Sequence, residues 1–241
     1  MFRIFTICLL TAAAVFSPAA GANENAIRQA FQSKFAEMPV ESVAKSPIAG
    51  IWEVVAQGQI FYVDEKVNYV LRGVLFDSKT PELRNLTAER EAQLAAQTLV
   101  KAQDLAIKRI KGSGKRILYT FEDPNCGYCK KLQEELVKLN NVTIYTFLLP
   151  IVSPPDSVEK SKAVWCAKDR GKAWDDLLSK GVVPGGSKTC DTPIEKTIQL
   201  AQRFGVRGTP AIYLANGQQI GGYLPLDKIE QALNSVGSKS Q

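Results

Sequence analysis

The alternation of apolar and polar positions in the first part of the chain predicts a small α+β unit over residues 23–86. Residues 26–38 carry apolar side chains at helical spacing, and Pro39 ends that helix. Three strand-like runs rich in β-branched and aromatic residues follow at 51–55, 60–63 and 69–76. A unit of this size is small for an independent domain, and the edge of its last strand offers a pairing surface to a second copy.

The next segment lacks Gly and Pro from Thr87 to Lys111 and repeats apolar residues every three or four positions, which predicts one long helix. Its apolar stripe is narrow and rich in Ala, so we interpret residues 87–113 as a linker helix rather than a core helix. Gly112-Ser113-Gly114 breaks the helix, and a second domain is expected from residue 114 to residue 241.

This second domain alternates strands and helices, a pattern typical of an α/β fold. Strands are predicted at 116–121 and 143–149 around a helix at 126–139, followed by a helical insertion within 155–204. A strand pair across the Asn216-Gly217 turn and a closing helix at 226–236 complete the domain.

The N-terminus predicts export. Residues 1–22 combine Arg3, an apolar run and Ala20-Gly21-Ala22, the three-part layout of a secretory signal peptide. An uncleaved anchor is the alternative, but the apolar run is shorter than the ~20 residues that span a bilayer. Cys8 leaves with the signal, and an even number of cysteines remains, which supports disulfides in an exported protein. The remaining cysteines are Cys126, Cys129, Cys166 and Cys190.

Composition narrows the chemistry further. The formal net charge of +6 comes from scattered basic residues, without the Lys/Arg runs that track nucleic acid, so we expect no nucleic-acid partner. The chain contains no histidine, which excludes Ser-His-Asp and Cys-His catalysis and His-ligated metal sites. We expect neither a metal nor another cofactor.

The motif Cys126-Gly127-Tyr128-Cys129 follows a predicted strand and opens a predicted helix. Its two sulfurs then lie one turn apart on one helix face, close enough to form a disulfide. Free N–H groups and the helix dipole favour a thiolate at the first cysteine. We therefore predict Cys126 as the nucleophile and Cys129 as its resolving partner, with Gly127 and Tyr128 setting access. A structural disulfide and half of a zinc site remain alternatives.

Several segments make the chain resemble the DsbC/DsbG family of periplasmic disulfide isomerases, with the DsbC branch the more similar. They span nearly the whole mature chain, so the resemblance is more specific than a lone Cys-x-x-Cys motif. The segments are Cys126 to Leu132, Val164-Trp165-Cys166-Ala167-Lys168-Asp169, Gly208-Thr209-Pro210-Ala211, Asn216-Gly217 and Gly222-Tyr223.

The resemblance implies a homodimer in which α+β N-terminal dimerisation domains join and two thioredoxin-like domains face a shared cleft. It implies isomerase and chaperone-like activity on misfolded disulfide-containing exported proteins in the periplasm, with an inner-membrane electron donor of the DsbD type keeping the dithiol reduced. By the same resemblance, Cys166 and Cys190 form a structural disulfide. Thr209 and Pro210 match the family's cis-proline loop, where Thr209 would contact substrate and adjust Cys126.

The chain departs from thioredoxin behind its second cysteine. The strand position that holds a buried acid in thioredoxin is occupied by Thr120, and we interpret the nearby Glu122 and Asp123 as solvated loop acids. The DsbC branch also lacks that acid. A dithiol oxidant and a DsbG-like reductase or chaperone remain alternative functions, although the DsbG branch usually has Pro where this chain has Gly127.

Overall fold

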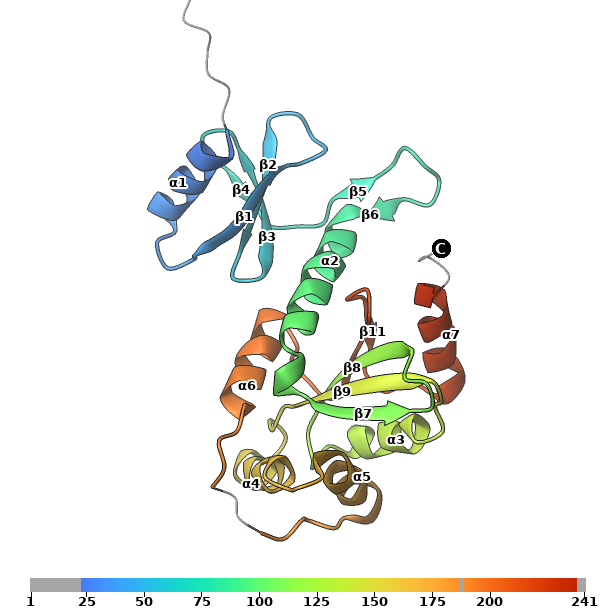
Figure 1. The fold of residues 1–241 in the computed structure, drawn as a ribbon. Coiled ribbons are helices and arrows are strands. Elements are labelled where there is room, and N and C mark those ends of the chain that lie inside the picture. The colour runs from blue at the N-terminus through green and yellow to red at the C-terminus, as the bar shows by residue number, and fades with distance from the viewer. Residues whose placement is uncertain (1–22, 187–188, 238–241) are drawn as a thin grey trace, which may run out of the picture.

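The structure is a computed structural model that describes residues 23–186 and 189–237. The signal peptide predicted at residues 1–22 lies outside them, as does Cys8. The described chain forms an N-terminal α+β domain and a C-terminal α/β domain, joined by helix α2 (Figure 1). Among the helices of this described part, none is both long enough and apolar enough to cross a bilayer.

The N-terminal domain is a four-stranded antiparallel sheet with one helix packed on it, which confirms the predicted α+β unit. Helix α1 (Glu24–Lys34) buries Ile27 and Phe31 against the sheet residues Trp52 and Phe61. Both residues of the Gln57-Gly58 turn have positive φ, as a tight hairpin requires. The strands, in spatial order, are β1 (Val40–Lys45), β2 (Ile51–Ala56), β3 (Gln59–Asp64) and β4 (Val70–Leu71).

The single strand predicted at 69–76 is wrong, because the run divides into two short strands. Strand β4 pairs with β3, whereas β5 (Phe76–Asp77) pairs with β6 (Arg84–Asn85). The backbone N–H of Leu75 donates to Thr87 Oγ1 at 2.8 Å, so this end of the run follows helix α2 instead of the sheet. The β4 edge remains exposed and presents apolar side chains.

Helix α2 (Leu86–Lys101) ends earlier than the helix predicted from Thr87 to Lys111. A short 3₁₀ helix (Gln103–Leu105) turns the chain, and β7 (Ile107–Lys111) follows as an edge strand of the second sheet. The sheet of the C-terminal domain therefore begins ahead of the boundary predicted at residue 114.

In β7, the alternation of buried and exposed positions does not match the alternation of apolar and polar residues in the sequence. Its inward-facing positions are Ile107 and Arg109, whereas Ile110 points outward and is 61% exposed. A buried arginine and an exposed isoleucine reverse the usual polarity of a half-buried strand. Hydrophobic spacing alone consequently favoured a helix.

Helix α2 is also not the simple linker that its Ala-rich stripe indicated. Leu99 is fully buried in the C-terminal core with Tyr119 and Phe147, and Leu94 packs against a cluster of the N-terminal sheet. At the start of the helix, Thr87 Oγ1 lies 2.6 Å from the hydroxyl of Tyr62. The helix therefore contributes to the packing of both domains.

The C-terminal domain has three layers, with helices on both faces of a five-stranded sheet (Figure 1). Strands β8 and β9 run parallel, and the other neighbours are antiparallel. Helices α3 (Gly127–Leu136) and α7 (Leu226–Gly237) pack on one face, and α2 and α6 (Ile194–Arg203) on the other. The strand order is β11 (Gln219–Gly221), β10 (Ala211–Leu214), β8 (Arg116–Glu122), β9 (Val142–Leu148) and β7.

The helical insertion predicted within 155–204 contains α4 (Pro154–Trp165), α5 (Arg170–Lys180) and α6. Apolar side chains of α4 and α5, including Trp165 and Trp174, pack around the first turn of α3. The insertion therefore closes the end of the sheet at which the dithiol lies.

Candidate active site

The Cys-Gly-Tyr-Cys motif lies at the start of α3, directly after β8 and a short turn. Cys126 caps the helix, and its Sγ accepts a hydrogen bond from the backbone N–H of Cys129 at 3.3 Å. N–H groups in a first helical turn stabilise negative charge on sulfur. Both cysteines are free thiols, with Cys126 6% exposed and Cys129 fully buried, so Cys126 is the more accessible of the two.

The buried thiol of Cys129 is strongly biased toward its protonated form. Burial raises the pKa of Cys129, and the negative charge of Glu122 raises it further, while the backbone N–H of Asp123 acts in the opposite direction. The side chains that pack around the two sulfurs include Ile107, Leu148, Val164, Trp174 and Leu177. Cys129 therefore needs a base before it can attack another sulfur.

The loop that contains Thr209 and Pro210 lies beside Cys126. The peptide bond between these two residues is cis, and the Cys126 thiol donates a hydrogen bond of 3.2 Å to the Thr209 carbonyl oxygen. Within the described chain, the buried hydroxyl of Thr209 has no hydrogen-bond partner. The fold therefore brings this distant loop and the dithiol together.

The two residues between the cysteines face the surface. Tyr128 is 60% exposed, its ring lies 6.4 Å from that of Tyr223, and Lys131 Nζ lies 5.3 Å from its centroid. Space is open where a side chain at Gly127 would begin. Both positions are thus open to the surface beside Cys126.

The interpretation of Asp123 as a solvated loop acid is wrong, because its side chain is fully buried. Its Oδ2 accepts hydrogen bonds from the backbone N–H groups of Ile151 and Val152 at 2.7 and 2.9 Å. Its Oδ1 accepts from Asn125 N at 2.7 Å and from Ser157 Oγ at 3.0 Å. Asp123 therefore holds the turn before Cys126 against the loop that leads into α4.

Glu122 is likewise fully buried, so its interpretation as a solvated acid is also wrong. Burial raises the pKa of Glu122, and the nearby Arg109 guanidinium opposes that effect. The apolar run ends at Phe121, which predicts a strand that ends there and a loop at Glu122. Extending the strand by one residue instead places Glu122 on the same face of β8 as the buried Thr120.

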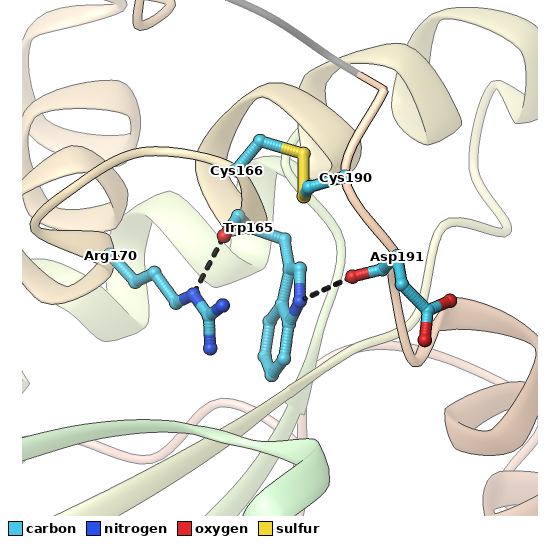
Figure 2. Close-up of a disulfide and its surroundings, with 5 residues drawn as sticks. All are labelled: Trp165, Cys166, Arg170, Cys190 and Asp191. Atoms are coloured by element: carbon cyan, nitrogen blue, oxygen red, sulfur yellow. Dashed lines mark hydrogen bonds between the residues drawn. A yellow bond between two sulfur atoms is a disulfide. The ribbon is translucent and has the colours of Figure 1, made fainter.

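The second cysteine pair lies in the helical insertion, where Cys166 and Cys190 form a disulfide between the end of α4 and the segment before α6 (Figure 2). Trp165 Nε1 donates to the Asp191 carbonyl oxygen at 3.2 Å, and Arg170 stacks on the Trp165 ring (Figure 2). Trp165 in turn packs in the cluster that contains Cys126 and Cys129. The disulfide therefore supports the wall of the dithiol site, and its cysteines are not available to complete a zinc site.

Comparisons with known proteins agree with this geometry. Residues 18–88 match the family described as the disulfide bond isomerase protein N-terminal domain, and residues 103–237 match a thioredoxin-like domain. A probable thiol:disulfide interchange protein DsbC of Bordetella pertussis is 40% identical over 210 residues, covering 87% of this chain and 74% of that protein. The DsbC of Escherichia coli K12 is 30% identical, with 94% of each chain covered.

Among solved structures, the disulfide interchange protein of Neisseria gonorrhoeae is 41% identical, with a TM-score of 0.53. It covers 55% of this chain and 96% of its own. These matches confirm the thioredoxin-like fold of the C-terminal domain and the resemblance on which the sequence interpretation rests. The chain belongs to the DsbC family of thiol:disulfide interchange proteins, and it is a thiol-disulfide oxidoreductase.

Proposed function

We propose that this chain is a periplasmic disulfide isomerase in which Cys126 attacks non-native disulfides of exported proteins. The observation that carries the proposal is the unequal exposure of two free thiols at the start of α3. The Cys126 thiolate attacks one sulfur of a client disulfide, which forms a mixed disulfide and releases the other client sulfur as a thiolate. A client thiol then displaces Cys126 and leaves a rearranged disulfide, or Cys129 displaces the client and leaves it reduced.

The loop at Thr209 and the exposed face of Tyr128 are proposed to hold the client beside Cys126. The carbonyl oxygen and the N–H of a loop residue can pair with an extended client segment, as an added strand pairs with a sheet edge. The carbonyl oxygen of Thr209 already accepts from the Cys126 thiol, and the hydroxyl of the same residue is buried without a hydrogen-bond partner among the described residues. Tyr128 and Tyr223 supply apolar contact to a partly unfolded client.

The N-terminal domain is proposed to form a homodimer through its β4 edge. An unpaired strand edge favours pairing with another chain, and exposed apolar side chains lie on β4 and on the residues that flank it up to β5. Dimerisation would turn two Cys126 sulfurs toward one cleft in which a misfolded client binds. The exposed apolar residues are Tyr69, Val70, Leu71, Val74 and Phe76.

Two further parts of the proposal concern the cell. The predicted signal peptide at 1–22 would send the chain to the periplasm, and an inner-membrane donor of the DsbD type would keep the dithiol reduced. An isomerase must begin with a free thiolate, so it requires such an electron source.

The central experiment combines scrambled ribonuclease reactivation with thiol trapping in the exporting cell. We expect the wild-type chain to reactivate the ribonuclease, the Cys126→Ser variant to fail, and the dithiol to be mostly reduced in the periplasm. A mostly oxidised dithiol would instead favour the oxidant. Reduction of small disulfides without ribonuclease reactivation would favour the DsbG-like reductase.

The dimer is tested by a truncation that begins at Leu86 and keeps α2 and the entire C-terminal sheet. Light scattering should report a dimer for the full mature chain and a monomer for the truncation. The monomer should still reduce small disulfides but isomerise protein substrates poorly. A monomeric full chain, or a truncation with undiminished isomerase activity, would contradict this part of the proposal.

A further inference from the structure

A cluster of buried polar side chains lies between the sheet and α3, beneath the dithiol. It is built on the inward positions of β7, β8 and β9 and contains Arg109, Thr120, Glu122 and Thr146. Glu122 Oε1 accepts hydrogen bonds from Thr120 Oγ1 at 2.6 Å and from Thr146 Oγ1 at 3.3 Å, and Arg109 Nη2 lies 3.9 Å away. Burying a carboxylate costs several kcal/mol of folding free energy, so a buried acid at this position calls for an explanation.

The two oxygens of this carboxylate have different surroundings. Oε1 receives the two hydroxyl groups and faces the guanidinium, whereas Oε2 is buried and has no hydrogen-bond partner among the described residues. A buried acceptor without a donor is uncommon and calls for an explanation. Among the described residues, Oε2 is therefore a free acceptor, and Arg109 Nε is the other buried polar atom of the cluster without a hydrogen-bond partner.

The buried face of α3 lies directly over this cluster. Gln133, one helical turn after Cys129, accepts a hydrogen bond from Arg109 at 2.8 Å and so fixes the helix above the strands. Cys129 belongs to the same face, and the charge of Glu122 acts on its thiol. The fold thus buries a free carboxylate oxygen and the Cys129 thiol on facing sides of the contact between α3 and the sheet.

We propose that Glu122 is the proton acceptor for Cys129 in the step that resolves the mixed disulfide. The inference rests on the proposed dithiol function. In this step, the Cys129 thiol gives its proton to the Glu122 carboxylate, and the Cys129 sulfur attacks Cys126 Sγ. The bond between Cys126 and the client sulfur breaks, the Cys126–Cys129 disulfide forms, and the client leaves as a thiolate while Glu122 holds the proton. When the disulfide is reduced again, Glu122 returns the proton to Cys129.

Other acids near the site are already engaged. Both oxygens of Asp123 accept hydrogen bonds from the surrounding loops. Asp175 is 39% exposed and binds Arg109 and Gln133 on the far side of the guanidinium. A general base acts directly or through one bridging water, so Glu122 does not need a direct hydrogen bond to the thiol.

The test separates the two chemical steps with a dithiobis(nitrobenzoate) reagent in stopped flow. Attack by Cys126 releases one coloured thiolate, and attack by Cys129 on the resulting mixed disulfide releases a second. We expect Glu122→Gln to retain the first phase and to slow the second about 100-fold, the lower end of the range for general acid–base catalysis. Glu122→Asp should recover part of the second phase, because it restores a carboxylate.

The pH profile and a matched control complete the experiment. Since burial raises the pKa of Glu122, the second phase of the wild-type chain should slow as the pH falls through that raised value, and Glu122→Gln should lose this dependence. Asp175→Asn removes another carboxylate that contacts Arg109, and it should leave the second phase within a few-fold of wild type.

The outcomes are distinguishable. A Glu122→Gln chain that resolves at the wild-type rate, or that slows both phases equally, would overturn the role of Glu122. So would an Asp175→Asn variant that slows the second phase as much as Glu122→Gln, because the effect would then belong to the network of Arg109. Failure of the dithiol function itself would appear separately, as the loss of the first phase in wild type.

Discussion

Two chemically identical substitutions in β7, Ile107→Ala and Ile110→Ala, distinguish a strand from the helix that hydrophobic spacing predicts. Residues three apart share a face in a helix, whereas residues an odd number apart lie on opposite faces of a strand. In the structure, Ile107 is 1% exposed and Ile110 is 61% exposed. The two variants should therefore differ in stability, although they remove the same atoms.

The expected magnitudes follow from these environments. Ile107 packs with Leu148, Trp174 and other residues near the dithiol, so its truncation leaves a cavity and should cost about 2–5 kcal/mol of unfolding free energy. Ile110 faces outward, and its truncation should change that free energy by no more than about 0.5 kcal/mol.

Urea unfolding followed by far-ultraviolet circular dichroism measures both variants against wild type. The dithiol serves as an internal check, since Ile107 packs in the same cluster as Cys126 and Cys129. Ile107→Ala should therefore also disturb the kinetics of thiol exchange, and Ile110→Ala should not. Equal losses of stability from the two variants would refute the strand assignment and restore one continuous helix.

Three further predictions concern the cysteines. Cys126→Ser should abolish client exchange, whereas Cys129→Ser should accumulate mixed disulfides on non-reducing gels; equal behaviour would contradict the assigned roles. Replacing both Cys166 and Cys190 by Ala should lower the free energy of unfolding by about 3 kcal/mol, because their sequence separation is 24 residues, and an unchanged urea midpoint would argue against it. In the reduced protein at neutral pH, iodoacetamide should modify Cys129 more slowly than Cys126, because Cys129 is fully buried and burial raises its pKa; equal rates of labelling by mass spectrometry would count against that order.

The elements that were predicted well are those in which local and tertiary preferences agree. The strands around residues 116–121 and 143–149 carry continuous apolar runs that are buried on both faces, and the helix after Cys126 begins at a natural cap. The prediction at β7 failed because Arg109 points inward. Its charge is compensated there by Glu122 and Asp175, which are distant in the sequence. The single strand predicted at 69–76 failed because the backbone N–H of Leu75 donates a hydrogen bond to Thr87 of helix α2, which sequence pattern does not reveal.

In the candidate site, too, some residues could be predicted from the sequence and others could not. The dithiol and its helix are adjacent in sequence, so their geometry follows from helix capping and could be foreseen. Glu122 could not be identified with equal ease, since its burial depends on where β8 ends and on how the insertion covers that end. Its partners come from three strands, and only the folded sheet brings Arg109 and Thr146 to it.

The two cysteines lie in different surroundings, and this difference bears on the choice between isomerisation and reduction. The N–H of Cys129 stabilises negative charge on Cys126 Sγ, which favours a ready nucleophile and a good leaving group. Cys129, in contrast, is buried beside a carboxylate and remains protonated until a base removes its proton. In the proposed mechanism, a mixed disulfide would persist long enough for a client thiol to attack it, and resolution by Cys129 would be the slower route by which a client that does not rearrange is released. If Glu122 controls that release, its oxygen Oε2 sets how long each client stays bound to Cys126.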